Sequence, residues 1–481
     1  MENKLVKVHS CTLAQLFEAE QSLVDVGIKG QLCIPEYQRP YVWEQKQINR
    51  LLNDLHEHNT SNVPDKPLFY LGTIILHQTH EALNIIDGQQ RITTMLLLNK
   101  FKAPNFKSGI EYKSSSSIEN IKRNVSYLKA VFEKDIYEFR DNTTIENLDF
   151  SKINVTLVVT STEDLAYTFF ETQNTGGVRL SGGDIVKAHH LRAIEGKKMI
   201  NHQARRWEQI EKNKVESIMQ YLCKVRYWDN RNWRKYPFYR DERGIKSELI
   251  DEFTERTLKN KEDVSYYYSA VKAENGRLMQ MYESHFKQLK QPLSDGNNAM
   301  NYINEYIELY DMLFNPQKRD YRISDELYLM VEKMMHGQSG TIFLKELLEI
   351  AIVAYVSRFG FYRLYESALW LYRFVYSMRV SSGRNVREDS VFKTVYDNQF
   401  IDNILEVHTV EQLHHYLKKY SYEFNKDHTE PNQSKDKHLQ SLKAYFGVDA
   451  FREIKHYADS PKEFDKHLMS AISKKISSTN E

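Results

Sequence analysis

The sequence predicts an α+β protein, in which a small mixed domain precedes a predominantly α-helical C-terminal region. Glycine and proline together make up 28 of the 481 residues (18 and 10), under half of the usual share of about 12%. A turn-rich sandwich or barrel is therefore not expected. Five of the prolines precede residue 105, and nine of the glycines precede residue 184. The first 190 residues therefore look mixed, and the remainder looks helical.

The elements of the first part follow from local patterns. Pro35 and Pro40 exclude a helix over residues 32–43, which we expect to be extended. Aromatic and β-branched runs or short apolar runs predict strands at 69–77, 82–86 and 153–159. Apolar spacing predicts helices at 45–55, 92–101, 118–139, 165–171 and 184–194, with a loop at 114–117 and a glycine-rich turn at 175–183.

Beyond about residue 200 the pattern is helical. Helix-type spacing covers 205–224, 246–289, 296–313, 325–335, 341–358, 362–379, 409–419, 436–456 and 462–475. The length is typical of two to four domains. We therefore expect a mixed domain over 1–195, a helical linker region over 196–290 and a helical C-terminal domain over 291–481.

Charge and cysteine content restrict the function classes. Lys and Arg total 66 and Asp and Glu total 65, a net charge of +1, which excludes a uniformly basic coat for nucleic acid but not a local basic patch. Three cysteines cannot build a disulfide framework or a four-thiolate zinc site. With no secretory signal and no run of 18 apolar residues, we expect a cytoplasmic protein without a membrane span.

A strand–turn–helix motif spans Ile85 to Thr94 and contains Asp87-Gly88-Gln89-Gln90-Arg91. Backbone N–H groups at a helix N-terminus bind anions, and glycine allows a ligand to approach closely. The Arg91 guanidinium suits phosphate, whereas Asp87 could hold a metal ion or position a water. The alternative is a capped helix with a solvated turn.

Two further segments carry polar side chains at points of restricted backbone. Between Pro35 and Pro40 and just beyond them, a rigid strip presents Gln38, Arg39, Tyr41 and Trp43, as a base-plus-phosphate ligand requires. The alternative is an edge strand with an aromatic anchor. Farther along, Asn174 precedes a glycine pair, and Asp184 and Lys187 lie one turn apart on the next helix. The alternative there is an ordinary helical connection with an ion pair.

The order IPEYQRPYVW, YLGTIIL, IIDGQQRITT and FFETQNTGGVRLSGGDIVK resembles the N-terminal domain of GmrSD-type modification-dependent restriction enzymes, over roughly residues 10–195. The resemblance implies a ParB/sulfiredoxin-like fold and a site that binds and hydrolyses a nucleoside triphosphate (NTP), with Mg²⁺ as the expected metal. Asp87, Gln90 and Arg91 would be catalytic. The nucleotide-binding set would be Gln38, Arg39, Tyr41, Trp43, Gly88, Gln89, Thr93, Asn174, Asp184 and Lys187.

The resemblance also implies a role in antiphage defence, in which NTP turnover is coupled to recognition of modified or foreign DNA. The family usually adds an HNH nuclease, in which a His activates water beside a divalent metal. The closest match is at His428, after residues 420–424 that could form a strand. Since the apolar residue after His428 and a later Asn element are missing, a solvated loop is the better interpretation.

We therefore expect DNA cleavage to need a partner nuclease chain, and a second copy of this chain is a further expected partner. The alternatives are a ParB-like nucleotide-gated DNA-binding regulator without nuclease activity, or a single-chain nuclease with a divergent HNH site. His189 and His190 are weak metal ligands by sequence, because adjacent residues on a helix point about 100° apart and no third ligand is evident. The metal of any nuclease site stays unknown.

A local basic segment lies at residues 222–246, where eight basic and three acidic residues give +5 (8 − 3). Aromatic residues alternate with the basic ones, and such pairs contact phosphates and stack on exposed bases. The alternative is a loop packed by its aromatic side chains with solvated charges. The candidate DNA contacts are Arg226, Arg231, Trp233, Arg234, Lys235 and Arg240.

Overall fold

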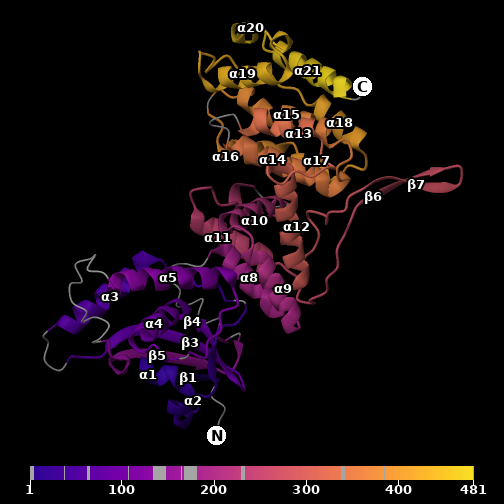
Figure 1. The fold of residues 1–481 in the computed structure, drawn as a ribbon. Helices are drawn as coiled ribbons and strands as arrows, with labels where there is room; N and C mark the ends of the chain where they lie inside the picture. Colours follow the sequence, from indigo (N-terminus) through magenta and orange to yellow (C-terminus); the bar gives the residue numbers. More distant parts are fainter. Residues whose placement is uncertain are drawn as a thin grey trace. The chain divides into compact units, whose positions relative to one another are not determined.

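The computed structural model describes residues 5–36, 38–61, 66–106, 108–133, 148–163, 165–166, 181–228, 233–336, 342–383 and 385–479. The chain divides into two compact units (Figure 1). The N-terminal unit comprises Met1–Leu180 and Glu195–Gln209, and the helical unit comprises Ser181–Ile194 and Ile210–Glu481. The chain therefore passes from one unit to the other three times.

The N-terminal unit is built on a five-stranded mixed sheet of order β1-β5-β3-β4-β2. The β1/β5 and β3/β4 pairs are antiparallel, and the β5/β3 and β4/β2 pairs are parallel. The strands are β1 (Val6–Thr12), β2 (Gln31–Cys33), β3 (Phe69–Gln78), β4 (Ala82–Asp87) and β5 (Ile153–Thr160). The three predicted strands are thus confirmed as the three central ones.

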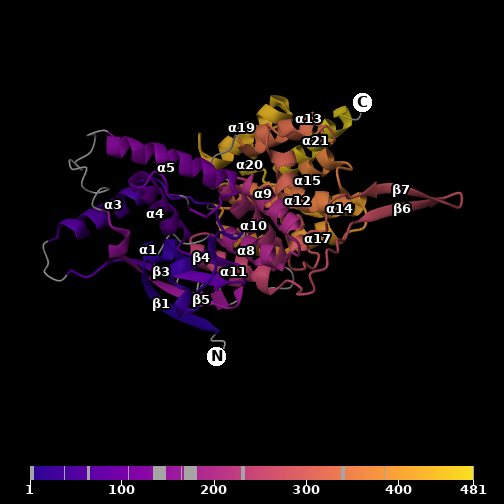
Figure 2. The same cartoon turned by 60° about the horizontal axis from the view of Figure 1, so that its bottom comes forward.

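Helices α3, α4 and α5 lie on one side of this sheet (Figures 1 and 2). The helical segments of the unit are α1 (Leu13–Phe17), α2 (Ala19–Ser22), α3 (Gln45–Thr60), α4 (Gln89–Lys102), α5 (Ser115–Glu133) and α9 (Lys197–Glu208), with 3-10 turns at Val24–Val26 and Phe150–Lys152. One apolar core joins helices to strands: Leu52 of α3, Met95 of α4, Ile74 of β3 and Leu157 of β5 are all buried in it. This core fixes the turn between β4 and α4.

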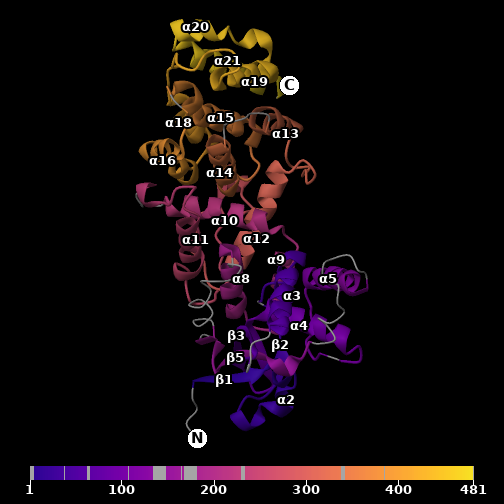
Figure 3. The same cartoon turned by 90° about the vertical axis from the view of Figure 1, so that its left-hand side faces the viewer.

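The helical unit is a stack of mostly short helices (Figure 3). They are α8 (Gly182–Ala193), α10 (Lys212–Tyr227), α11 (Glu242–Ile250), α12 (Asn297–Phe314), α13 (Asp325–Met330), α14 (Ile342–Phe359), α15 (Leu364–Ser381), α16 (Glu388–Asp397), α17 (Phe400–Glu406), α18 (Val410–Lys419), α19 (Ser434–Phe446), α20 (Ile454–Asp459) and α21 (Glu463–Thr479). Short turns of 3-10 or π type lie at Trp233–Lys235, Asp251–Glu255, Val331–His336 and Val448–Ala450. At its centre, Arg373 of α15 is buried and donates two hydrogen bonds to Asp465, at 2.7 and 2.6 Å.

The chain crosses between the units at Ile194–Glu195, beside the predicted boundary at 195, but the flanking helices join the units opposite to those expected, and no crossing falls at the predicted boundary at 290. Helix α8 packs in the helical unit, whereas α9 returns to the N-terminal unit. No division falls near residue 290, because Arg226 of α10 donates to the backbone carbonyls of Leu289 and Gln291. Such buried hydrogen bonds tie the linker region and the C-terminal region into one body.

The prediction of helix over 246–289 is wrong beyond residue 255. Strands β6 (Ser269–Glu274) and β7 (Arg277–Glu283) instead form an antiparallel hairpin that stands out from the helical unit (Figures 1 and 2). Its turn is Asn275-Gly276, both with positive φ (51° and 77°), a sequence that strongly favours a two-residue hairpin turn. Residues 420–424 were considered as a strand, but they are extended without a strand partner among the described residues.

No helix in the described ranges has the length and apolar character needed to cross a lipid bilayer.

Candidate functional site

The turn from β4 to α4 is the centre of the candidate site. Asp87 ends β4, and Gly88 follows with φ of 97° and is the N-cap of α4. A Cβ atom at Gly88 would lie 2.4 Å from Ile74 Cδ1, so both backbone conformation and packing demand glycine. The first N–H groups of α4 have no acceptor within their own helix. The turn is therefore suited to a polar or anionic ligand.

Arg91 is directed toward the sheet. Its Nη2 donates to Asp87 Oδ2 at 3.1 Å and to Thr73 O at 2.7 Å, and Nη1 donates to Leu71 O at 3.1 Å. The carbonyls belong to the residues on either side of Gly72, where the pairing of β3 with β5 shifts register. Arg91 thus fixes a β-bulge and orients Asp87, and the predicted contact of Arg91 with phosphate stays a prediction.

Gly72 makes room for this arginine. Its φ is 117°, and a Cβ atom would lie 2.1 Å from Arg91 Nη1. We expect Gly72→Ala to lower the free energy of unfolding by about 2 kcal/mol, because alanine is strained at this φ and displaces the guanidinium. Chemical denaturation of the full chain measures this loss. Gly196→Ala is the matched control, since its φ of 88° is also positive but nothing lies within 4 Å of its Cβ position. Equal losses in both variants would contradict a role for the Arg91 contact.

Gln90 holds the proline-bounded strip in place. Its Oε1 accepts from the N–H groups of Val42 and Trp43, at 2.8 and 3.2 Å, and its Nε2 donates to Pro40 O at 3.1 Å. Tyr41 is fully buried, with its hydroxyl 2.8 Å from Thr94 Oγ1, and burial raises the pKa of this phenol. Gln90 and Tyr41 thus make hydrogen bonds within the protein, and these bonds hold the proline-bounded strip in position.

Residues of α5 and of the loop before it complete this network, and the sequence did not single them out. Asn124 Nδ2 donates to Trp43 O at 2.7 Å, and Asn120 Nδ2 donates to Tyr41 O at 2.7 Å. Thr93, a predicted nucleotide ligand, is 1% exposed and accepts a hydrogen bond from Tyr112 Oη at 2.8 Å.

A small, partly open cleft lies beside the N-terminus of α4. Among the predicted ligands, Gln38, Arg39 and Gln89 line it, whereas Asp87 and Arg91 do not. The full lining is Ile34, Pro35, Glu36, Gln38, Arg39, Pro40, Gln89, Glu111, Tyr112, Lys113, Ser114, Ser117, Ala204, Arg205 and Glu208. Gln89 of the motif therefore lines the cleft, whereas Asp87 and Arg91 lie outside it.

Gln89 is the most informative residue of the cleft. Its side chain is 5% exposed, and Oε1 has no hydrogen-bond partner in the described structure. Leaving a buried acceptor unpaired costs about 1–3 kcal/mol. Gln38, by contrast, is anchored, since its Nε2 donates to Ile86 O at 2.7 Å. Gln89 thus offers an acceptor to a ligand with an N–H or O–H group.

Three cations and three carboxylates surround the cleft, and of these six only Arg39 was a candidate from sequence. Lys113 lies 2.6 Å from Glu36 Oε1, and this hydrogen bond raises the pKa of the lysine. Arg205 and Glu208 come from α9, more than 100 residues from the turn. Because a long chain separation hides such a contact, only the fold reveals it.

The segment with Asn174, Asp184 and Lys187 is described only in part. Asn174 lies outside the described residues. Asp184 forms a capping box with Ser181 at the start of α8, and Lys187 on the same helix is 3% exposed. Both residues belong to the helical unit. Their predicted place in the nucleotide pocket stays a prediction.

The basic aromatic segment divides into a buried and an exposed half. The predicted DNA contact of Arg226 is wrong, because its side chain is only 11% exposed and Nε donates to Glu252 Oε1 at 2.9 Å. Tyr236 is likewise buried, against Tyr227 and Phe392. The interpretation as a packed loop is therefore confirmed for the buried half, and DNA contact stays a prediction for the exposed half.

The exposed half is basic and aromatic. Arg234 lies over the ring of the half-buried Trp233, and Arg240 lies over the ring of Tyr239. The exposed basic and aromatic side chains are Arg234, Lys235, Phe238, Tyr239, Arg240 and Arg243, and the acids Asp241 and Glu242 are exposed among them. We call the six, with Trp233, the exposed basic patch. Arg231 lies outside the described residues.

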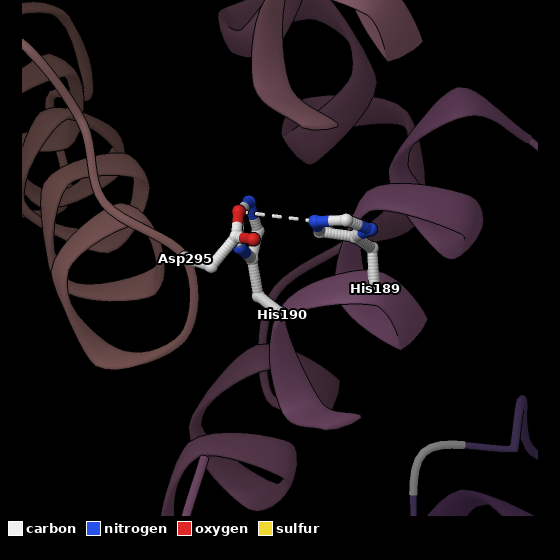
Figure 4. A group of neighbouring side chains, drawn as sticks. All are labelled: His189, His190 and Asp295. Carbon is white, nitrogen blue, oxygen red and sulfur yellow. Dashed lines mark hydrogen bonds and ion pairs between the residues drawn. The ribbon is translucent and has the colours of Figure 1, made fainter. Parts of the chain in front are cut away.

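The C-terminal histidines do not converge. His428 is exposed in a turn with φ of 59°, whereas His414 and His438 are buried beside Ser367 and Tyr372. Among the described residues, the group of His, Cys, Asp and Glu that is close enough to hold a metal is His189, His190 and Asp295 (Figure 4). A third ligand therefore does lie beside the two adjacent histidines.

Residues 15–191 match the family described as "GmrSD restriction endonuclease, N-terminal domain". The N-terminal part of this chain is thus similar to the N-terminal domain of GmrSD restriction endonucleases. Residues 199–432 match a family of unknown function, DUF7834. No curated protein matches the chain. The match to the GmrSD-type domain ends before α9, so Arg205 and Glu208 complete the cleft from outside the family's segment.

Proposed function

We propose that the chain is the nucleotide-dependent component of an antiphage restriction system. The GmrSD-type domain assigns the chain to restriction. In the proposal, this domain binds and hydrolyses an NTP at the β4–α4 turn, and the helical unit engages DNA through the exposed basic patch. The observation that carries the nucleotide part is the buried, unpaired Gln89 Oε1 in a cleft bordered by cations.

The cleft chemistry fits a nucleotide better than an apolar ligand. An exocyclic amine of a base or a sugar hydroxyl would satisfy Gln89 Oε1. Arg39, Lys113 and Arg205 supply positive charge for phosphates. The acids Glu36, Glu111 and Glu208 offset part of that charge, so we expect moderate rather than very tight binding.

Hydrolysis is assigned to the other side of the turn. Asp87 is about one-third exposed, and within the described residues its Oδ1 has no protein partner because Arg91 holds Oδ2. In the proposal the terminal phosphate extends from the cleft across the turn, where Asp87 Oδ1 orients the attacking water. The products are a nucleoside diphosphate and phosphate, and the proton of the water passes through Asp87 to solvent. The same carboxylate fits Mg²⁺ that arrives on the phosphates, where the ion neutralises their charge.

Arg205 provides the test of the cleft. Arg205→Ala should weaken NTP binding about tenfold, because an exposed cation that contacts phosphate contributes on the order of 1 kcal/mol. Equilibrium titration of the full chain with each of the four Mg·NTPs measures the change. Lys197→Ala removes an exposed cation at the start of the same helix but outside the cleft lining, and should bind like wild type. Equal effects of both substitutions would place the nucleotide elsewhere.

DNA cleavage is assigned to a partner chain. His428 has no neighbouring histidine or carboxylate close enough to share a metal among the described residues, so nothing there favours an intrinsic HNH site. Incubation of modified phage DNA with the chain, NTP and Mg²⁺ tests this directly. Cleavage by the isolated chain that His428→Ala abolishes would overturn the assignment.

A further inference from the structure

His189 and His190 at the end of α8 both face Asp295, in the loop before α12 (Figure 4). His189 Nε2 lies 3.0 Å from Asp295 Oδ1, and His190 Nδ1 lies 3.9 Å from the same oxygen. One ligand atom from each of the three residues lies within 4.8 Å of the others. The two rings are nearly perpendicular, at 87°, so two adjacent helical residues converge on one point.

The surroundings hold Asp295 firmly. Its Oδ1 accepts from Thr257 Oγ1 at 2.5 Å, and Lys259 Nζ lies 3.4 Å from Oδ2. Burial raises the pKa of Asp295, but the hydrogen bonds from His189 and Thr257 and the two neighbouring imidazoles outweigh it and hold this pKa below its usual range. Asp295 is thus a carboxylate anion at neutral pH, as a metal ligand must be.

His190 is available as a neutral ligand. Its side chain is fully buried, and this burial lowers its pKa well below the ordinary value for histidine. The Nδ1 lone pair accepts a hydrogen bond from Gly296 N–H, at 3.2 Å, which a bound ion would displace. His189 is 27% exposed, which leaves a route from solvent to the group.

We propose that His189 Nε2, His190 Nδ1 and Asp295 Oδ1 form a site for a divalent transition metal of the zinc class. Two imidazoles and one carboxylate suit Zn²⁺, with water in the fourth position, whereas Mg²⁺ prefers oxygen ligands. On binding, the ion replaces the hydrogen that His189 Nε2 now shares with Asp295, and His189 carries its proton on Nδ1 instead. The Thr257 hydroxyl orients the carboxylate from behind.

A metal ion at this site would cross-link two segments of the helical unit. It joins α8 to the segment before α12, two elements that are 106 positions apart in sequence at His189 and Asp295. Metal binding then stabilises this unit according to the affinity for the ion. The inference does not depend on the proposed nucleotide chemistry, because all three ligands lie in the helical unit.

The test uses the full chain, stripped with EDTA and titrated with Zn²⁺ against a chromogenic chelator. Wild type should bind one equivalent, and its melting temperature should rise on loading. His189→Ala should weaken binding at least tenfold, while His428→Ala, which removes an exposed histidine elsewhere, should bind like wild type. Since Asp295→Asn could unfold the unit, the partly exposed His189 is the primary variant, with circular dichroism to establish its fold.

Cobalt provides a second readout. Co²⁺ in place of zinc should give the visible absorption of a four- or five-coordinate nitrogen and oxygen site without thiolate, and His189→Ala should remove it. Failure of wild type to bind one equivalent of Zn²⁺, or equal binding by wild type and His189→Ala, would overturn the proposal and leave a purely hydrogen-bonded network. Neither readout involves NTP turnover.

Discussion

Asp87→Asn should reduce NTP turnover by about 10² to 10⁴-fold, the usual contribution of a residue that manages a proton or a water in the transition state. Asparagine has the shape of aspartate and can still accept a hydrogen bond from Arg91, so the turn should survive. The substitution removes the carboxylate charge and, with the amide oxygen kept toward Arg91, places an NH₂ donor where Oδ1 accepts. Phosphate release from Mg·NTP by the full chain, with and without modified phage DNA, measures the effect.

Comparison of Arg91→Ala with Asp87→Asn separates a catalytic role of the turn from a structural one. This arginine holds two β3 carbonyls as well as Asp87, so its loss should lower both turnover and unfolding free energy, the latter by about 2–3 kcal/mol. Asp87→Asn should lower turnover alone. Normal turnover in Asp87→Asn, or no turnover in wild type with any nucleotide, would remove the catalytic assignment of the turn.

Reversal of four charges in the exposed basic patch should weaken DNA binding by at least two orders of magnitude. The change is Arg234, Lys235, Arg240 and Arg243 to Glu. Each phosphate contact contributes about 0.9 to the slope of log K against log salt concentration. The slope should therefore become shallower by about three if most of the four residues contact phosphate. Fluorescence anisotropy with a labelled duplex over a salt series measures both quantities.

A matched control distinguishes the effect of the exposed basic patch from the effect of a change in total charge. Lys426, Lys437, Lys455 and Lys466 are exposed on the C-terminal part of the helical unit, and their reversal to Glu changes the total charge equally. The control should retain the wild-type salt slope. The same slope in wild type and in the patch variant would show that residues 233–243 form only a solvated surface.

Whether a strand could be predicted from the sequence depends on how deeply its residues are buried. Strands β3, β4 and β5 lie inside the sheet and carry continuous apolar runs, so they were predicted. Strands β1 and β2 are its edges, and their half-exposed residues give little signal. The β6–β7 hairpin differs from the predicted helix for another reason. The Asn275-Gly276 pair favours a hairpin turn, but the apolar spacing of residues 246–289 also fits a helix.

In the candidate site, the sequence predicts which polar residues occur together but not what each side chain contacts. Sequence identified Asp87-Gly88-Gln89-Gln90-Arg91 as a polar turn, because residue type and order suffice for that. Whether a guanidinium reaches a ligand or a carbonyl depends on distant backbone, as at Arg91. Arg226 and Arg240 lie in one short segment, yet Glu252 and Tyr302 bury the first alone.

The exchange of α8 and α9 between the units limits how the gene can be divided. A fragment that ends at residue 195 keeps α8, which packs elsewhere, and loses the helix that carries Arg205. The cleft beside α4 would lose part of its lining, and the buried residues of α8 would be left without their neighbours. A fragment that keeps the packing of both helices must extend through residue 209 and must include the helices that cover α8.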